Sequence, residues 1–165
     1  RVDLNRLVEE VLHLYDGSEQ MAGDVAVPLR FDPDPACPPI LGDAQQLGQV
    51  IHNLVQNALD ASSGAAGRSP EGVVVRTHWS DTSHRVHLTV SDHGPGFPET
   101  ILKRAFEPYV TTKARGTGLG LPMVKKIADE HHARLDVSNR MADGQVLGAQ
   151  VSLAFEPLRE VVEIH

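Results

Sequence analysis

The sequence contains one cysteine, few aromatic residues, no basic run and no long apolar run. Cys37 is the only cysteine in 165 residues, so a framework of internal disulfides is excluded. The formal net charge is −7 and aromatic residues make up 4% of the chain. A general nucleic-acid surface would act against this negative field, so we expect no nucleic-acid partner. No apolar run approaches the roughly 20 residues of a membrane-spanning helix, and we expect this chain not to span a membrane.

The start of the sequence lacks an initiator methionine and a signal peptide. The chain begins at Arg1, inside a helical pattern. We therefore expect a segment of a longer protein, whose other parts could include an anchor in the inner membrane. The lone cysteine fits a reducing compartment, so we expect the segment to lie in the cytoplasm. On its own we expect it to be monomeric.

Hydrophobic periodicity predicts three helices, at about 3–15, 43–62 and 121–131. Alternating patterns predict five strands, at 25–31, 72–80, 84–92, 134–139 and 146–155. Because Pro28 cannot donate to a ladder, the first strand belongs at a sheet edge. Consecutive strand pairs interspersed with helices indicate an α+β fold, a two-layer α/β sandwich. We expect a mixed, mostly antiparallel sheet with the helices over one face.

The segment between the predicted strand at 84–92 and the last predicted helix has little hydrophobic pattern. It runs from about 93 to 119 and holds a possible short helix at about 99–105. Irregular segments of this length inside a compact domain are usually lids or binding loops. We expect a single domain over 1–155, with 156–165 as a C-terminal tail or linker.

A glycine-rich loop precedes the last helix. Residues 114–124 read ARGTGLGLPMV, with glycines at 116, 118 and 120. Glycine lets backbone amides approach a ligand, and Pro122 suits the first turn of a helix. A helix N-terminus favours phosphate through its free N–H groups and partial positive charge. The spacing is GxGxG, so neither the dinucleotide fingerprint nor the P-loop motif is present.

Two other segments carry candidate chemistry, one with a pair of asparagines and one with an aspartate. Asn53 and Asn57 are one helical turn apart and border an apolar stripe, although asparagine is unfavourable in a helix interior. Their amide oxygens are suitable ligands for Mg²⁺, and a solvated polar flank is the alternative. Asp92 ends a strand and precedes Gly94 and Gly96. It could accept a hydrogen bond from an exocyclic amine, or could close an Asx turn.

Taken together, three segments are far more specific than each alone. HNLVQNALDA (52–61), DHGPG (92–96), and FEPYVTTK with GTGLGL (106–121) occur in this order. This combination resembles the ATP-binding catalytic domain of sensor histidine kinases, in the GHKL superfamily with its Bergerat-type ATP-binding fold. The resemblance covers about 3–155. The segment from 106 to 131 looks most like nitrogen-regulation sensors of the NtrB and NtrY type.

The resemblance implies ATP and Mg²⁺ as ligands and assigns roles to residues. Asn57 would bind Mg²⁺ with help from Asn53, Asp92 would bind the adenine amino group, and 116–120 would wrap the phosphates. Phe106, Pro108 and Tyr109 would seat the lid. The implied ATP-binding residues are Asn53, Asn57, Asp60, Asp92, Gly94, Gly96, Phe97, Tyr109, Thr112, Lys113, Arg115, Gly116, Thr117, Gly118, Leu119, Gly120 and Leu121.

One position bears on the type of reaction. Hydrolytic relatives, such as gyrase and the heat-shock chaperone ATPases, have a water-activating glutamate four residues before the magnesium asparagine. Here that position is Asn53, which cannot act as a general base near neutral pH. We therefore expect the γ-phosphate to be kept for transfer to a histidine on a dimerisation domain, with a response regulator as the indirect partner. A GHKL-type ATPase clamp and a non-catalytic nucleotide-sensing module are the alternatives.

The chain departs from the family pattern at two positions. Asp60 stands where many histidine kinases have a lysine, so we expect Lys113 or Arg115 to supply the positive charge at the phosphates, with Lys113 as the catalytic candidate. His132 stands where the family usually has glycine, and we expect a slightly altered helix end. None of the nine histidines has the sequence context of a phosphoacceptor. We interpret His131 and His132 as surface residues.

Overall fold

The computed structural model describes residues 2–13, 21–22, 25–26, 29–62, 72–92 and 120–157. These residues form three helices, a five-stranded sheet and a separate two-stranded ribbon. The helices are α1 (Leu4–His13), α2 (Ala44–Ser62) and α4 (Gly120–Glu130). The strands of the sheet are β3 (Leu29–Asp32), β4 (Val73–Ser80), β5 (Arg85–Ser91), β6 (Arg134–Ala142) and β7 (Gln145–Phe155). These elements confirm the three predicted helices and the predicted strands at 72–80, 84–92, 134–139 and 146–155.

The strand order of the sheet is β3-β4-β5-β7-β6. β3 pairs parallel with β4, and the other neighbours pair antiparallel. Parallel neighbours need a crossover, and α2 lies within the connection between β3 and β4. The sheet is therefore mixed and mostly antiparallel, as predicted, with β3 at an edge.

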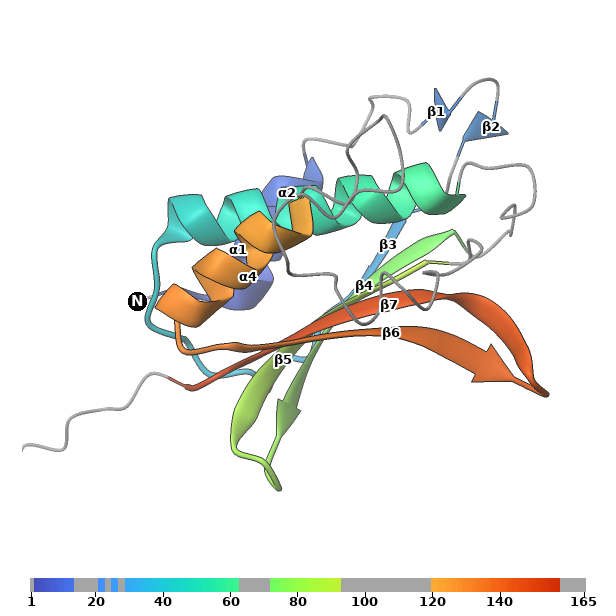
Figure 1. Cartoon of the computed structure of the whole chain (residues 1–165). Helices are drawn as coiled ribbons and strands as arrows, with labels where there is room; N and C mark the ends of the chain where they lie inside the picture. The colour runs from blue at the N-terminus through green and yellow to red at the C-terminus, as the bar shows by residue number, and fades with distance from the viewer. Residues whose placement is uncertain are drawn as a thin grey trace, which may run out of the picture.

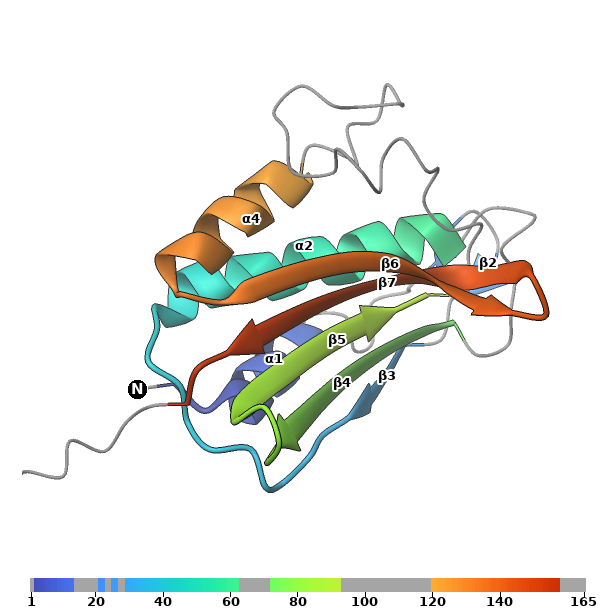
Figure 2. The ribbon, with the colours of Figure 1, turned by 60° about the horizontal axis from the view of Figure 1, so that its bottom comes forward.

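The helices lie on one face of the sheet (Figure 1). α2 contacts β4 and β5, α4 contacts β6, and α1 packs beside α2. The core lies between the layers, where side chains such as Val55, Val75, Leu88 and Leu153 are buried. Figure 2 shows the other face of the sheet, which no helix of the described residues covers. The predicted two-layer α/β sandwich is confirmed.

The prediction of a single strand at 25–31 is wrong. β2 (Val25–Ala26) pairs antiparallel with β1 (Met21–Ala22) in a separate two-stranded ribbon, and β3 begins only at Leu29. Proline has no backbone N–H and a fixed φ, so a residue such as Pro28 disfavours a continuous ladder through its position.

Aspartate side chains cap the first two helices. Asp3 Oδ1 accepts the N–H of Arg6, and Asp43 Oδ1 accepts the N–H groups of Gln45 and Gln46. Each cap satisfies amides that have no partner within the helix. Asp3 is therefore the N-cap of α1, and Asp43 is that of α2.

Asp34 ties the loop before α2 to the sheet. Its carboxylate accepts the N–H of Trp79 at 2.8 Å and that of Ala36 at 3.0 Å. Its carbonyl oxygen accepts a hydrogen bond from the Asn5 side chain of α1 at 2.8 Å. The amide of Trp79 and then that of Ala36 lower the pKa of the Asp34 carboxyl, because both stabilise the charged form.

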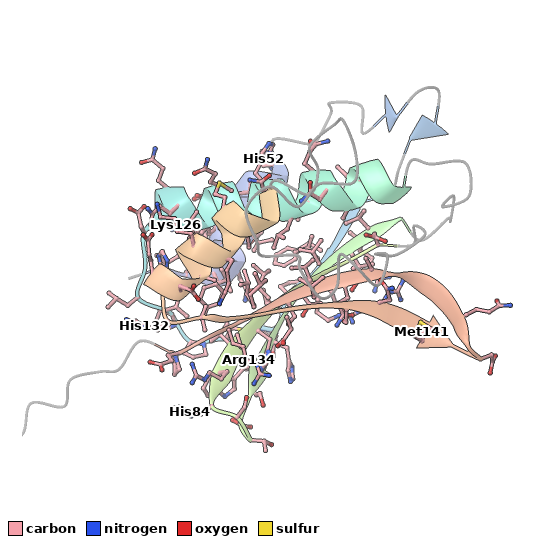
Figure 3. The ribbon with its side chains drawn as sticks, in the orientation of Figure 1. His52, His84, Lys126, His132, Arg134 and Met141 are labelled. Atoms are coloured by element: carbon pink, nitrogen blue, oxygen red, sulfur yellow. The ribbon has the colours of Figure 1, made fainter. Side chains whose placement is uncertain are left out.

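Two positive-φ positions close the β6–β7 hairpin. Asp143 has φ 52° and Gly144 has φ 76°. Positive φ at both central residues is the type I′ turn, which Asp-Gly favours. This turn joins the two strands that the sequence pattern predicts at 134–139 and 146–155. Met141, labelled in Figure 3, lies near the outer end of this hairpin.

No helix in the described ranges is long and apolar enough to cross a membrane. Pro157 forms a bridge with Ile40, which also pairs with Val2. The division into a domain over 1–155 and a tail over 156–165 stays a prediction.

Candidate functional site

Asp92 is a buried carboxylate at the end of β5. Its side chain is 5% exposed, and Thr77 is the other buried polar side chain in the described residues. The Asp92 N–H donates to the Ala149 carbonyl at 2.9 Å, and Asp92 Oδ1 accepts the Ala149 N–H at 2.9 Å. These two bonds fix the position of Asp92 at the end of the sheet. Because an ionised carboxylate only accepts hydrogen bonds, a ligand at this point would have to offer a donor.

The backbone carbonyl of Asp92 has a different partner. Arg140 of β6 donates from Nη2 to this oxygen at 2.7 Å. The two contacts come from β6 and β7, two strands that follow Asp92 in the sequence by more than 40 residues. Sequence reasoning did not identify Arg140, because nothing in the local pattern relates it to Asp92.

Asn53 and Asn57 lie on α2 and are half-buried. Asn53 Nδ2 donates to Met123 Sδ of α4 at 3.7 Å, a weak bond to a thioether. The contact shows that the Asn53 face of α2 is turned toward α4. Residues four apart on a helix share a face, so Asn57 lies on the same side.

The N-terminal end of α4 lies beside α2 (Figure 1). The helix begins at Gly120, so Pro122 is in its first turn, as predicted. The free N–H groups of this turn and the helix dipole favour an anion near Asn53. The glycine-rich sequence thus leads into a helix whose first turn contacts Asn53.

The site residues of the segment 93–119 lie outside the described residues. They are Gly94, Gly96, Phe97, Phe106, Pro108, Tyr109, Thr112, Lys113, Arg115, Gly116, Thr117, Gly118 and Leu119, together with the predicted helix at 99–105. Asp60 lies in α2 and Gly120 and Leu121 lie in α4, at positions where only the backbone is described. Their predicted roles stay predictions.

The family comparison matches most of the chain. The model of histidine kinase-, DNA gyrase B- and HSP90-like ATPases matches residues 42–157. The chain belongs to this ATPase family. The match begins just before α2 and runs to the end of β7, so it includes Asn53, Asn57, Asp92 and α4. Membership of the family confirms the resemblance inferred from the three sequence segments.

Curated proteins similar to this chain include sensor histidine kinases. The sensory histidine kinase/phosphatase NtrB of Rhodobacter capsulatus is 39% identical over 132 residues, which are 76% of this chain and 36% of NtrB. The predicted similarity to nitrogen-regulation sensors is thereby confirmed. The chain spans about a third of the length of NtrB and 22% of that of sporulation kinase A of Bacillus subtilis, which is 34% identical over 143 residues, 87% of this chain.

Solved structures of family members have the same fold. The catalytic domain of histidine kinase ThkA, in a nucleotide-free form, superposes with a TM-score of 0.71 at 28% identity, over 94% of this chain and 93% of that one. Full-length ShkA in complex with AMPPNP gives a TM-score of 0.72 at 27% identity, over 93% of this chain and 30% of that one.

The donor set at α2 fits an ion that is held mainly by its substrate. The described residues contain no cluster of three or more histidine, cysteine, aspartate or glutamate side chains able to hold a metal. Mg²⁺ often takes only one or two protein ligands and keeps phosphate oxygens and water. A single amide oxygen from half-buried Asn57, on the same side of α2 as Asn53, meets that requirement.

A cavity of about 460 Å³ lies beside α1 and the start of α2. It is lined by residues of α1 and of the loop before α2, including Arg6, Cys37 and Pro39. None of the predicted site residues lines it. Burial raises the pKa of the Cys37 thiol, which disfavours the thiolate form.

The interpretation of both neighbouring histidines as surface residues is wrong for His131. His131 is half-buried and its ring bonds to the α2 cap, with Nε2 3.0 Å from the Asp43 nitrogen. His132 is exposed, at the C-terminal end of α4 (Figure 3). It adopts φ 55°, the conformation that glycine would adopt without strain. The altered helix end is therefore confined to one strained residue.

Proposed function

We propose that this chain is the ATP-binding catalytic domain of a two-component sensor histidine kinase. The observation that carries the proposal is the buried carboxylate of Asp92, which is fixed at the end of β5 by hydrogen bonds across the sheet. Its geometry suits recognition of the adenine amino group. The contact between α2 and the first turn of α4 supports a metal and phosphate site close by.

In this proposal, different residues bind the adenine and the phosphates of ATP. Asp92 accepts the exocyclic N–H of adenine, and the N-terminus of α4 with residues 116–120 binds the phosphates. Asn57, helped by Asn53, holds Mg²⁺, which neutralises phosphate charge. Lys113 or Arg115 supplies the positive charge that Asp60 does not. ShkA, bound to AMPPNP, is a relative of similar fold, which supports a triphosphate as the ligand class.

The reaction that follows is transfer rather than hydrolysis. Asn53 replaces the glutamate that would activate water, so bound ATP is kept for an imidazole acceptor. The bond from the γ-phosphorus to the bridging oxygen breaks as a bond to an imidazole nitrogen of the dimerisation domain forms, and ADP leaves. The domain then acts in the cytoplasm as a monomeric unit of the parent protein, with a response regulator receiving the phosphoryl group afterwards.

Calorimetry with Mg²⁺ and ATP tests the proposal. Binding is expected for the wild-type chain, and Asp92→Ala or Asn57→Ala should weaken it by at least about ten-fold, the loss of one good polar contact. Lys126→Ala, an exposed position on α4, is the matched control. No binding by the wild-type chain, or binding that Asp92→Ala leaves unchanged, would contradict the proposal.

A second assay separates transfer from the ATPase alternative. The chain alone should neither release phosphate in sustained turnover nor acquire stable label from labelled ATP. Addition of a dimerisation domain that carries an acceptor histidine should allow labelling of that domain. Sustained phosphate release that is lost on Asn57→Ala would favour an ATPase clamp instead.

A further inference from the structure

The ladder between β5 and β7 ends at Asp92 in an unusual way. In an antiparallel hydrogen-bonded pair, each residue normally donates its N–H to the carbonyl of the other. Asp92 donates to the Ala149 carbonyl in this manner, but the Ala149 N–H donates to the Asp92 carboxylate at 2.9 Å. The side chain of Asp92 therefore occupies the acceptor place in the ladder that its own carbonyl would take.

Arg140 donates a hydrogen bond to the Asp92 carbonyl, which does not accept the Ala149 N–H. Its Nη2 lies 2.7 Å from the Asp92 carbonyl oxygen. β7 lies between β6 and β5, so the Arg140 side chain must pass over β7 to reach Asp92. The residue of β7 opposite Arg140 is Gly148, whose missing side chain leaves this path open.

The carbonyl and the carboxylate of Asp92 are alternative acceptors for the N–H of Ala149. If the carbonyl of Asp92 lost Arg140, it would be free to turn back and accept the Ala149 N–H in the regular ladder. The carboxylate would then lose the Ala149 N–H as a donor, and its orientation would change. Arg140 thus keeps the carbonyl out of the ladder and thereby keeps the carboxylate in it.

Stability alone does not account for this arrangement. Arg140 Nε is buried and has no hydrogen-bond partner within the described part of the chain. A buried unpaired donor costs free energy, and such exceptions call for an explanation. A role in holding Asp92 for its ligand supplies one.

We propose that Arg140 is a positioning residue for adenine recognition by Asp92. This inference rests on the proposed ATP site. Arg140 touches no nucleotide in this proposal and acts only through the orientation of the Asp92 carboxylate. Its effect should therefore appear in the discrimination between purine bases that carry the exocyclic amine and those that lack it.

The test compares ATP with purine riboside triphosphate, which has no 6-amino group, by calorimetry in the presence of Mg²⁺. Arg140→Met keeps the length of the side chain and removes its donors. It should weaken ATP binding by about ten-fold, equivalent to about one hydrogen bond to a charged group. The dissociation constant of the analogue should change by less than about two-fold, because that ligand offers Asp92 no amine.

Further variants keep the test independent of folding defects. Arg140→Gln cannot reach across β7 and should give the same selective loss, whereas Arg140→Lys should recover part of the discrimination. Arg134→Met is the matched control, because Arg134 is exposed on the same strand and pairs with Asp136 at 3.4 Å. Urea denaturation of each variant reports whether the fold is retained.

The outcomes distinguish this inference from the proposed function. If the wild-type chain binds ATP and folded Arg140→Met or Arg140→Gln loses affinity for both nucleotides equally, or for neither, the positioning role is overturned. If the wild-type chain binds neither nucleotide, the proposed ATP site fails and the role of Arg140 falls with it. Selective loss of ATP binding supports both.

Discussion

The Nε2 atom of His131 accepts the backbone N–H of Asp43 at 3.0 Å. The other ring nitrogen, Nδ1, lies 2.8 Å from the Ile127 carbonyl oxygen, so Nδ1 carries the proton and donates to it. The ring also lies against Gly42, where an added Cβ would come within 2.8 Å of His131 Cδ2. His131 therefore joins the C-terminal end of α4 to the N-cap of α2, the two helices of the proposed phosphate site.

His131→Ala should lower the free energy of unfolding by about 1–2 kcal/mol, because it removes two hydrogen bonds and the packing against Gly42. Urea denaturation followed by circular dichroism measures the change. Lys126→Ala, on the exposed side of the same helix, should alter stability by less than about 0.5 kcal/mol. Equal stability of the two variants would show that the bond to Asp43 contributes nothing.

His132→Gly should stabilise the protein. The Ala133 N–H donates to the Ala128 carbonyl at 2.8 Å and the His132 N–H to that of Asp129 at 3.1 Å, which is the Schellman pattern. His132 holds φ 55° at the position where glycine is favoured. Relief of the left-handed strain should raise the free energy of unfolding by about 1 kcal/mol. His132→Val should lower it, and thermal unfolding of the three proteins provides the ranking.

Acid should destabilise the protein partly through Asp34. The amides of Trp79 and Ala36 hold the pKa of its carboxyl in the folded state below the ordinary value of 3.8. The folded state therefore binds this proton more weakly than the unfolded state. The stabilisation is fully present above pH 3.8 and is lost as the pH falls through the folded-state pKa.

Asp34→Asn tests this pH dependence. The variant should be less stable than the wild type near neutral pH, and the difference should shrink as the pH falls below about 4. Denaturation curves at several pH values give the free energies. A difference that stays constant from pH 7 to pH 2 would assign the role of Asp34 to something other than its charge.

The sequence predicted the fold well wherever a hydrophobic pattern repeated. The stripe through Leu47, Leu54 and Val55 predicts α2, and the alternation in β4 and β5 predicts the first hairpin. Turn chemistry at Asp143 and Gly144 locates the second. Each of these signals is local, because it reflects the conformation and burial of consecutive residues.

The relationships missed by the sequence join residues that are distant in the chain. Arg140 and Asp92 are 48 positions apart, and His131 and Asp43 are 88 apart. Such contacts depend on strand order and on which side chain crosses a neighbouring strand, and no periodicity encodes either. The sequence indicates Asn57 and Asp92 as candidate ligand-binding residues. The contacts that position Asp92 are visible only in the folded structure.

His87 should reduce stability as the pH falls below its ordinary pKa of 6.5. Burial, followed by the charges of His78 and Arg85, lowers the pKa of His87 in the folded state. The unfolded state therefore binds the proton more strongly, and stability falls as the pH drops from about 6.5 to the folded-state pKa.

A substitution of His78 tests the cause of this shift. His78 pairs with His87 in the ladder, and their ring centroids lie 6.3 Å apart. His78→Gln removes one of the charges that oppose protonation, so the pKa of His87 should rise toward 6.5 in an NMR titration of its ring nitrogens. An unchanged pKa in this variant would leave burial and Arg85 as the causes of the shift.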